Sequence, residues 1–155
     1  MHRFTAAALL AAAQRTVVVL GEARATILAG ADETGGAVGM VDYRMPPGYK
    51  GPPAHIHPTF DEIFFIAEGA LTFRLGDDQP TANTGDTVVV PGAVPHTFAN
   101  FGGAAARVMI VLAPGGFESY FQELANLFAG GAPDREAIQR LSEQYGVTTV
   151  GPPLG

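Results

Sequence analysis

Apolar and polar residues alternate along short stretches in the first two thirds of the chain, and turn-forming residues separate these stretches. Alternation places successive side chains on opposite faces and is typical of β-strands. Glycine pairs such as Gly35-Gly36 and Gly102-Gly103 mark strand ends. The pattern predicts strands over Thr16–Leu20, Ala23–Leu28, Ala37–Met45, His55–His57, Glu62–Glu68, Ala70–Leu75, Thr87–Val90, His96–Asn100 and Arg107–Ala113.

After Pro114 the apolar residues recur every three or four positions, which is the period of an amphipathic helix. The apolar stripe of the first predicted helix consists of Phe117, Tyr120, Phe121, Leu124, Leu127 and Phe128. Gly130-Gly131 ends it, and a second helix is predicted from Pro133-Asp134 to Gly146. The wide stripe favours packing against the outside of the β-structure or against a partner, and a lid or ligand wall is the alternative.

The composition is that of a single packed domain, and its charge argues against polyanionic partners. The chain has 155 residues, 47% of them hydrophobic, and a formal net charge of −6 with Lys50 as the only lysine. The lack of a basic cluster argues against nucleic acid and anionic membranes. There is no cysteine, which fits a reducing compartment, and no apolar run is long enough to span a membrane. We therefore expect a cytoplasmic protein.

The N-terminus is the one segment that resembles a targeting signal. Met1-His2-Arg3 precedes the alanine-rich stretch Ala6–Ala13, but the apolar part is short and leads directly into a predicted strand. We favour a helical or frayed extension over a signal peptide and interpret His2 as a mobile terminal residue. The predicted organisation is an extension over residues 1–14, a β-domain over 15–114, and a helical segment with a tail over 115–155.

Three histidines and one glutamate form the strongest chemical pattern in the chain. His55 and His57 lie two residues apart in an extended segment, so their imidazoles point to the same face. Glu62 follows after a bend at Pro58, and His96 must come from another strand. Successive side chains of a strand point to opposite faces, and this alternation, or parity, favours Glu62 over Asp61 as the ligand. Imidazole and carboxylate together suit one divalent transition metal ion, with Fe, Mn, Ni, Co, Cu and Zn all compatible.

These residues resemble the two sequence motifs of the cupin superfamily. His55, His57, Glu62 and Gly69 match the first motif, Gly-x5-His-x-His-x3 or x4-Glu-x6-Gly. The second motif, Gly-x5-Pro-x-Gly-x2-His-x3-Asn, is matched by Gly85, Pro91, His96 and Asn100. Two positions depart from the pattern. Gly48 and Gly51 miss the opening glycine position by one residue or more, and Ala93 replaces the central glycine of the second motif, with Gly92 beside it.

The resemblance implies an all-β fold, a double-stranded β-helix (jelly-roll) barrel followed by two C-terminal helices. It also implies that His55, His57, Glu62 and His96 bind one metal ion. In motif and short length the chain is similar to quercetin 2,3-dioxygenase-like single-domain cupins. This favours a dioxygenase acting on a flavonol-like or other enolisable aromatic molecule, with Glu62 as catalytic base. The alternatives are a redox-neutral isomerase or cyclase, and a cupin that only binds a small molecule.

Parity also predicts which side chains line the pocket beside the metal. Phe64 and Phe98 each follow a ligand by two residues and should face inward. Further predicted pocket residues are Tyr43, Met45, Phe73 and Met109. An aromatic pocket with few charges suits a flat apolar ligand. Single-domain cupins commonly pair, so we expect a homodimer, with the N-terminal strand and the segment Glu62–Ile66, which is apolar on both faces, as candidate contacts.

Overall fold

Two antiparallel sheets make up most of the molecule. The computed structural model describes residues 4, 6–131 and 134–155. One sheet has the order β1-β2-β3-β10-β5-β8 and the other the order β11-β4-β9-β6-β7. The strands are β1 Val17–Leu20, β2 Ala23–Ala29, β3 Gly39–Met45, β4 Ala54–Ile56, β5 Asp61–Glu68, β6 Ala70–Leu75, β7 Thr81–Asn83, β8 Thr87–Val90, β9 His96–Ala99, β10 Ala106–Ala113 and β11 Thr148–Gly151.

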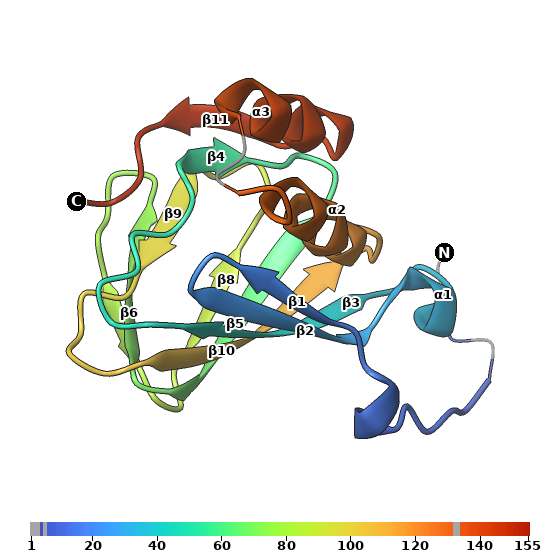
Figure 1. Ribbon diagram of the computed structural model, residues 1–155. Helices are drawn as coiled ribbons and strands as arrows, with labels where there is room; N and C mark the ends of the chain where they lie inside the picture. Colours follow the sequence, from blue (N-terminus) through green and yellow to red (C-terminus); the bar gives the residue numbers. More distant parts are fainter. Residues whose placement is uncertain (1–3, 5, 132–133) are drawn as a thin grey trace.

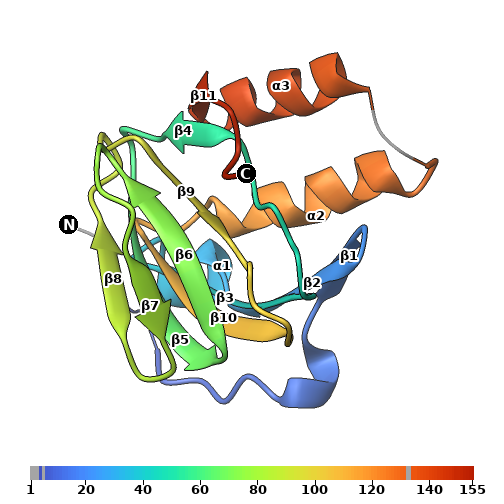
Figure 2. The same ribbon diagram turned by 90° about the vertical axis from the view of Figure 1, so that its left-hand side faces the viewer.

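The two sheets face each other and enclose the core, as Figures 1 and 2 show. The helical elements are η1 Ala12–Gln14, α1 Ala31–Thr34, α2 Glu118–Phe128 and α3 Arg135–Gln144. This is a double-stranded β-helix (jelly roll) with two C-terminal helices, so the predicted fold class is confirmed. All eleven predicted elements, nine strands and two helices, begin and end within two residues of those in the structure; the strand predicted over Ala37–Met45 begins at Gly39. Pro133, where we predicted the start of the second helix, lies outside the described residues.

Strict alternation along the strands builds the interior of the barrel. In β3 and β10 every second side chain is buried, because successive residues point to opposite faces of the sheet. The largest buried apolar side chains include Tyr43, Met45, Phe64, Ile66, Leu71, Phe73, Phe98 and Leu112. The interior is therefore markedly aromatic and carries few charges.

The first C-terminal helix covers the open side of the barrel rather than its outer wall. In Figure 1, α2 crosses the gap between β4 and β1, and Figure 2 shows the same placement from another side. Phe121 is buried and lies edge-on to Tyr43, with 5.9 Å between the ring centroids. At Phe121 the apolar stripe thus joins the barrel interior, so packing against the outer wall is wrong for this residue, and contact of the rest of the stripe with a partner stays a prediction. The helix closes the barrel because its apolar face fills the space that the two sheets leave open.

The chain returns to the barrel after the second helix. We predicted no strand after Gly146 and a tail over Gly151–Gly155, but β11 pairs with β4, placing Thr148 opposite Ile56 and Thr149 opposite His55. Leu154 is buried beyond this strand. The C-terminus therefore covers the edge of the strand that carries His55. The short strand β7 was not predicted either.

A buried carboxylate connects α2 to the segment before β3. Glu118 is 3% exposed, and its two oxygens accept hydrogen bonds from the backbone N–H groups of Ala31 (2.6 Å) and Gly116 (2.7 Å). A Cβ atom at Gly39 would lie 2.2 Å from one of these oxygens, so the glycine leaves space for the carboxylate. Glu118 thus fixes the position at which α2 begins.

Replacing Glu118 by alanine should lower the free energy of unfolding by about 2–3 kcal/mol, because two backbone donors lose a charged acceptor. Thermal and denaturant unfolding would measure the loss. Glu136→Ala is the matched control, since Glu136 forms only an exposed ion pair with Arg140 and should change stability by about 0.5 kcal/mol or less. Equal effects of the two substitutions would contradict the role given to Glu118.

Candidate metal centre

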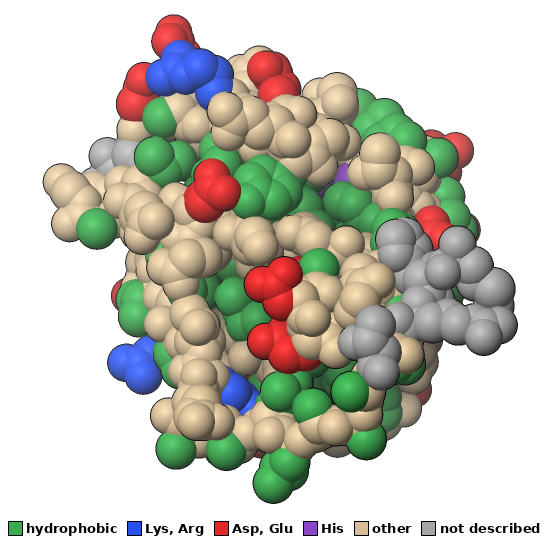
Figure 3. Space-filling model, turned by 90° about the vertical axis from the view of Figure 1, so that its right-hand side faces the viewer, with side chains coloured by type: hydrophobic (Ala, Val, Ile, Leu, Met, Phe, Trp, Pro, Cys, Tyr) green, Lys and Arg blue, Asp and Glu red, His purple; other side chains and the backbone are tan. Residues whose placement is uncertain are grey.

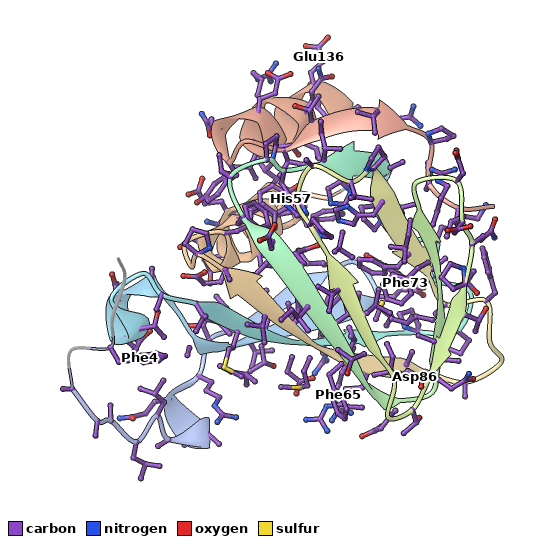
Figure 4. All side chains as sticks on the ribbon, turned by 180° about the vertical axis from the view of Figure 1, so that it is seen from behind. Phe4, His57, Phe65, Phe73, Asp86 and Glu136 are labelled. Carbon is purple, nitrogen blue, oxygen red and sulfur yellow. The ribbon has the colours of Figure 1, made fainter. Side chains whose placement is uncertain are left out.

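The four predicted ligands come together where the two sheets meet. His55 on β4 lies directly opposite His96 on β9 in the five-stranded sheet. Glu62 comes from β5 in the six-stranded sheet, and His57 lies in the turn that joins the two. The potential ligand atoms of all four side chains lie within 4.8 Å of one another. Figure 4 labels His57 at this junction.

The local backbone holds His57 at its place. The N–H of His57 donates to the carbonyl of Gly92 (2.8 Å), and the N–H of Gly92 donates to the Asp61 carboxylate (2.9 Å). Asp61 therefore faces away from the ligand group and supports the loop, while Glu62 on the opposite face of the strand enters it. Parity correctly separated the two carboxylates.

Each of the three imidazoles is fixed by a hydrogen bond to the backbone. A carbonyl oxygen can only accept, so every Nδ1 carries the proton and every Nε2 lone pair is free for a cation. This arrangement prepares three neutral nitrogen ligands. The donor–acceptor distances are 2.9 Å for His55 to Pro53, 2.8 Å for His57 to Phe60 and 2.8 Å for His96 to Val94.

The distances between the converging atoms fit a common ion. Nε2 of His57 lies 3.2 Å from Nε2 of His96 and 3.3 Å from Oε2 of Glu62, and the His96–Glu62 distance is 3.1 Å. Ligands ~2.1 Å from one ion are separated by roughly 3.0–3.4 Å at octahedral or tetrahedral angles. His57, His96 and Glu62 therefore fit a mononuclear divalent metal ion, and the ligand atoms of all four residues, His55 included, lie within 4.8 Å of one another. Coordination positions beyond these four would remain for water, substrate or dioxygen in a six-coordinate site.

Burial and mutual charge set the protonation of the site. Burial acts to raise the pKa of Glu62, but hydrogen bonds from His57 and His96 outweigh it and lower the pKa to about 2. Burial lowers the pKa of His55 to about 4, and the nearby His96 adds to the shift. For His57, burial favours the neutral form, but the Glu62 carboxylate prevails and raises the pKa. At neutral pH Glu62 is therefore ionised and His55 neutral.

The raised pKa of His57 has a consequence for metal retention. A proton and a metal ion compete for the same Nε2 atom, and a raised pKa means that this atom binds the proton more tightly. We expect metal release on acidification to begin above the ordinary histidine pKa of about 6.5, with affinity falling about tenfold per pH unit below the pKa of His57. The metal-to-protein ratio after dialysis between pH 8 and pH 5 measures this. A ratio that stays constant over this range would contradict the prediction.

A column of aromatic rings leads from the centre to the C-terminal helices. Phe60 stacks on the His57 imidazole with 3.9 Å between centroids and an angle of 4°. Phe117 stacks on Phe60 at 4.6 Å, and Tyr120 on Phe117 at 4.8 Å. The sequence analysis missed Phe60, because it lies in a turn, where strand parity does not apply. Figure 3 shows a histidine side chain visible between apolar side chains on one face of the molecule.

Five of the six predicted pocket residues point into the barrel, and one does not. Tyr43, Met45, Phe64, Phe73 and Phe98 are buried inside. The assignment of Met109 is wrong: on β10 the buried side chains are those of Val108 and Ile110, so Met109 faces outward, opposite Phe65. Its parity was misjudged because Val108, Met109 and Ile110 are all apolar. Tyr49 was not predicted, although its hydroxyl lies 2.6 Å from that of Tyr43.

Comparison with known proteins supports the cupin superfamily. Residues 41–112 match the protein family described as Cupin domain. Protein SchB from Streptomyces halstedii is 33% identical over 60 residues, which cover 39% of this chain and 44% of that protein. The chain thus spans less than half the length of the curated relatives it matches.

Solved structures share the fold at low sequence identity. A sugar phosphate isomerase of the cupin superfamily from Silicibacter pomeroyi aligns with a TM-score of 0.58 and 22% identity, over 68% of this chain and 75% of that one. The polyketide cyclase RemF from Streptomyces resistomycificus aligns with a TM-score of 0.60 and 16% identity, over 70% and 80% of the respective chains. At these identities the likeness establishes the fold alone.

Proposed function

From the cupin fold and its four converging ligands, we propose that this protein is a metal-dependent enzyme that oxygenates an enolisable aromatic small molecule. The observation that carries the proposal is the convergence of three backbone-anchored Nε2 atoms and one carboxylate. His55, His57, Glu62 and His96 would hold one divalent ion. When bound, that ion would supply Lewis acidity toward a substrate oxygen and a route for electrons to dioxygen.

Glu62 is the residue placed to move a proton. Its carboxylate is 6% exposed and ionised at neutral pH. A pKa of about 2 makes a weak base, but that value depends on hydrogen bonds donated by His57 and His96. Once both imidazoles are neutral ligands, these bonds are lost, and Glu62 would act as a base when its own bond to the ion is loose. It can then take the proton of an enol or phenol hydroxyl, leaving an electron-rich enolate to react with dioxygen.

The aromatic character of the barrel interior is the basis for choosing an aromatic substrate. Phe64, Phe73 and Phe98 contact one another with centroids 5.3–6.0 Å apart, and flat rings pack well against such edges and faces. The hydroxyls of Tyr43 and Tyr49 bond to each other, and this single bond uses one of their two protons. One O–H donor therefore remains among the described contacts for an oxygen atom of the substrate.

Replacing Tyr43 by phenylalanine should raise KM about five- to tenfold and change kcat little. The hydrogen bond to the substrate oxygen is remote from the reacting atoms, so it stabilises the bound substrate and the transition state equally. Steady-state kinetics of the metal-loaded enzyme would measure the split. Tyr145→Phe is the matched control, since its hydroxyl bonds Glu123 near the surface and should leave both constants unchanged. A fall in kcat with unchanged KM would contradict the positioning role.

Oxygen consumption tests the proposed reaction. The metal-loaded protein should consume dioxygen with a panel of flavonols and other enolisable aromatics, and both atoms of ¹⁸O₂ should enter the product. Glu62→Gln should lose turnover. The likeness to the polyketide cyclase RemF favours one second candidate, redox-neutral cyclisation, which would form product equally well without oxygen. Substrate binding without turnover in either condition would overturn the enzymatic proposal.

A further inference from the structure

The four tyrosines of the chain belong to one connected set of aromatic rings. The ring centroids of Tyr43 and Tyr49 are 6.0 Å apart. Phe121 on α2 joins Tyr43 (5.9 Å) to Tyr120 (6.2 Å), and Tyr145 lies 5.6 Å from Tyr120. The chain has no tryptophan and no cysteine, so these tyrosines are the side chains that lose one electron most easily.

The column of aromatic rings connects this set to the metal centre. The column starts at His57, whose Nε2 faces the other ligands, and Phe60 stacks on this imidazole. Phe117 and Tyr120 continue the stack, and Tyr145 lies edge-on to Phe117 with 6.0 Å between centroids. Ring contacts of this kind give an electron a path of short steps between the centre and the C-terminal helices.

The residue types along the column change with distance from the centre. Phe60 and Phe117, the two rings nearest the imidazole, have no hydroxyl group and hold their electrons more tightly than a phenol does. An electron vacancy therefore does not rest on them. A tyrosine gives up an electron readily only when its phenol proton leaves at the same time. The tyrosine that has a proton acceptor thus determines where the vacancy comes to rest.

Tyr145 is paired with such an acceptor. Among the contacts of the described residues, it is the one tyrosine whose hydroxyl donates to a carboxylate, Oε1 of Glu123, at 2.6 Å. Glu123 lies on α2 and Tyr145 directly follows α3, and the two helices run side by side (Figures 1 and 2). Burial, together with this carboxylate, raises the pKa of Tyr145 to about 12. At neutral pH the phenol therefore keeps its proton until the ring is oxidised.

The other three tyrosines bond to hydroxyl groups, which are poor bases. The hydroxyls of Tyr43 and Tyr49 bond to each other, and burial raises the pKa of Tyr43 well above its ordinary value. The hydroxyl of Tyr120 lies 3.1 Å from that of Ser142. An oxidised ring at any of these positions would keep a proton that its neighbour does not take.

We propose that the column is an electron path by which Tyr145 reduces an over-oxidised metal centre, with Glu123 as proton acceptor. Tyr145 gives one electron to an ion that peroxide or dioxygen has oxidised, and the ion falls by one oxidation state. The phenol proton passes to Glu123, which leaves a neutral tyrosyl radical near the protein surface. A soluble one-electron reductant, such as a thiolate, returns the electron, and Glu123 returns the proton.

Such a path protects the site when substrate is absent. It rests on the proposed function in one respect, since dioxygen chemistry is what would oxidise the ion. Without a path, an oxidised ion attacks the groups nearest to it, among them the imidazole of His57. Apolar packing alone does not explain the two phenols at the far end of the column. Phenylalanine at positions 120 and 145 would fill the same space without forming hydrogen bonds.

Radical detection in the iron-loaded protein tests the path. Protein loaded with Fe(II) and cleared of unbound iron is mixed with an equal amount of hydrogen peroxide, frozen at successive times, and measured by electron paramagnetic resonance. The wild type should form a tyrosyl radical, which spin trapping and peptide mass spectrometry should locate on Tyr145. Tyr145→Phe should lose this radical. Glu123→Gln should form it at least ~10-fold more slowly, because an amide does not accept the proton.

Matched variants separate the path from general oxidation. Tyr49→Phe removes a tyrosine outside the column, and Glu136→Gln removes an exposed carboxylate that pairs with Arg140, so both should keep the radical yield of the wild type. Phe117→Leu keeps an apolar side chain but interrupts the stack, and it should lose most of the radical. Equal yields in wild type and Tyr145→Phe, a wild-type radical on another tyrosine, or the same radical in metal-free protein would overturn the proposal.

Retention of iron distinguishes this proposal from the proposed function. Under repeated additions of peroxide with a thiol and no organic substrate, the wild type should keep its iron longer than Tyr145→Phe, whose histidine ligands are oxidised. A protein that forms the radical but oxygenates no substrate would contradict only the proposed function. A protein that oxygenates a substrate but never forms the radical would contradict only the electron path. A protein that binds no redox-active ion would overturn both.

Discussion

Replacing His57 by alanine is expected to abolish metal binding. The side chain is fully buried, its Nδ1 is held by the carbonyl of Phe60, and its Nε2 lies within 3.3 Å of both Glu62 and His96. Loss of a ligand from such a site should lower affinity by more than the ~100-fold typical for a supporting residue. Elemental analysis of protein purified without added metal should give near-stoichiometric metal for the wild type and almost none for the variant.

His57 also packs against Phe60, so the substitution could destabilise the fold as well as the site. His55→Ala provides an independent variant, because His55 is only partly buried and its removal leaves a smaller cavity. Metal-free wild type, prepared with a chelator, serves as the reference for circular dichroism and thermal unfolding. Stoichiometric metal retained in both folded variants would exclude the proposed ligand set.

Sequence parity located most of this site because the ligands lie on or beside regular strands. His55 and Glu62 could be placed on inward faces from alternation, and Asp61 could be set aside. His96 was placed by its motif, since all four residues of its strand are buried and show no alternation. His57 follows the last residue of β4, so its direction depends on the turn and on the hydrogen bond to Gly92. No local sequence pattern reveals this contact between His57 and Gly92, which are 35 positions apart.

The parts of the fold that were not predicted are those whose position depends on contacts with distant parts of the chain. β11 is only four residues long, Thr148–Gly151, and forms because β4 offers an unpaired edge. The helix α2 has the same amphipathic pattern whether it packs outside or inside a barrel, so the pattern could not show that it fills the open side. Met109 lies in an unbroken apolar run, where alternation carries no signal.

A second large effect is expected from Gly92→Ala. A Cβ atom at Gly92 would lie 2.0 Å from the carbonyl oxygen of Phe60 and 2.3 Å from that of His57, and both are backbone atoms that cannot move aside. The loop must shift, which breaks the hydrogen bond from His57 N–H to the Gly92 carbonyl (2.8 Å). We expect a loss of about 3 kcal/mol or more in unfolding free energy, roughly 10 °C in Tm, together with weaker metal binding.

The requirement for glycine has thus moved by one position relative to the cupin motif. Ala93 occupies the motif position, is exposed, and has an ordinary negative φ, since no described non-glycine residue has a positive one. Ala93→Gly should therefore cost less than ~1 kcal/mol. At Gly103 a Cβ atom would meet nothing within 4 Å, so Gly103→Ala should be neutral or stabilising by about 0.5 kcal/mol. The unfolding free energy and the metal content of the Gly92→Ala and Gly103→Ala variants are compared. If they are equal, the close approach of the Gly92 backbone to the carbonyl groups of Phe60 and His57 does not fix the position of His57.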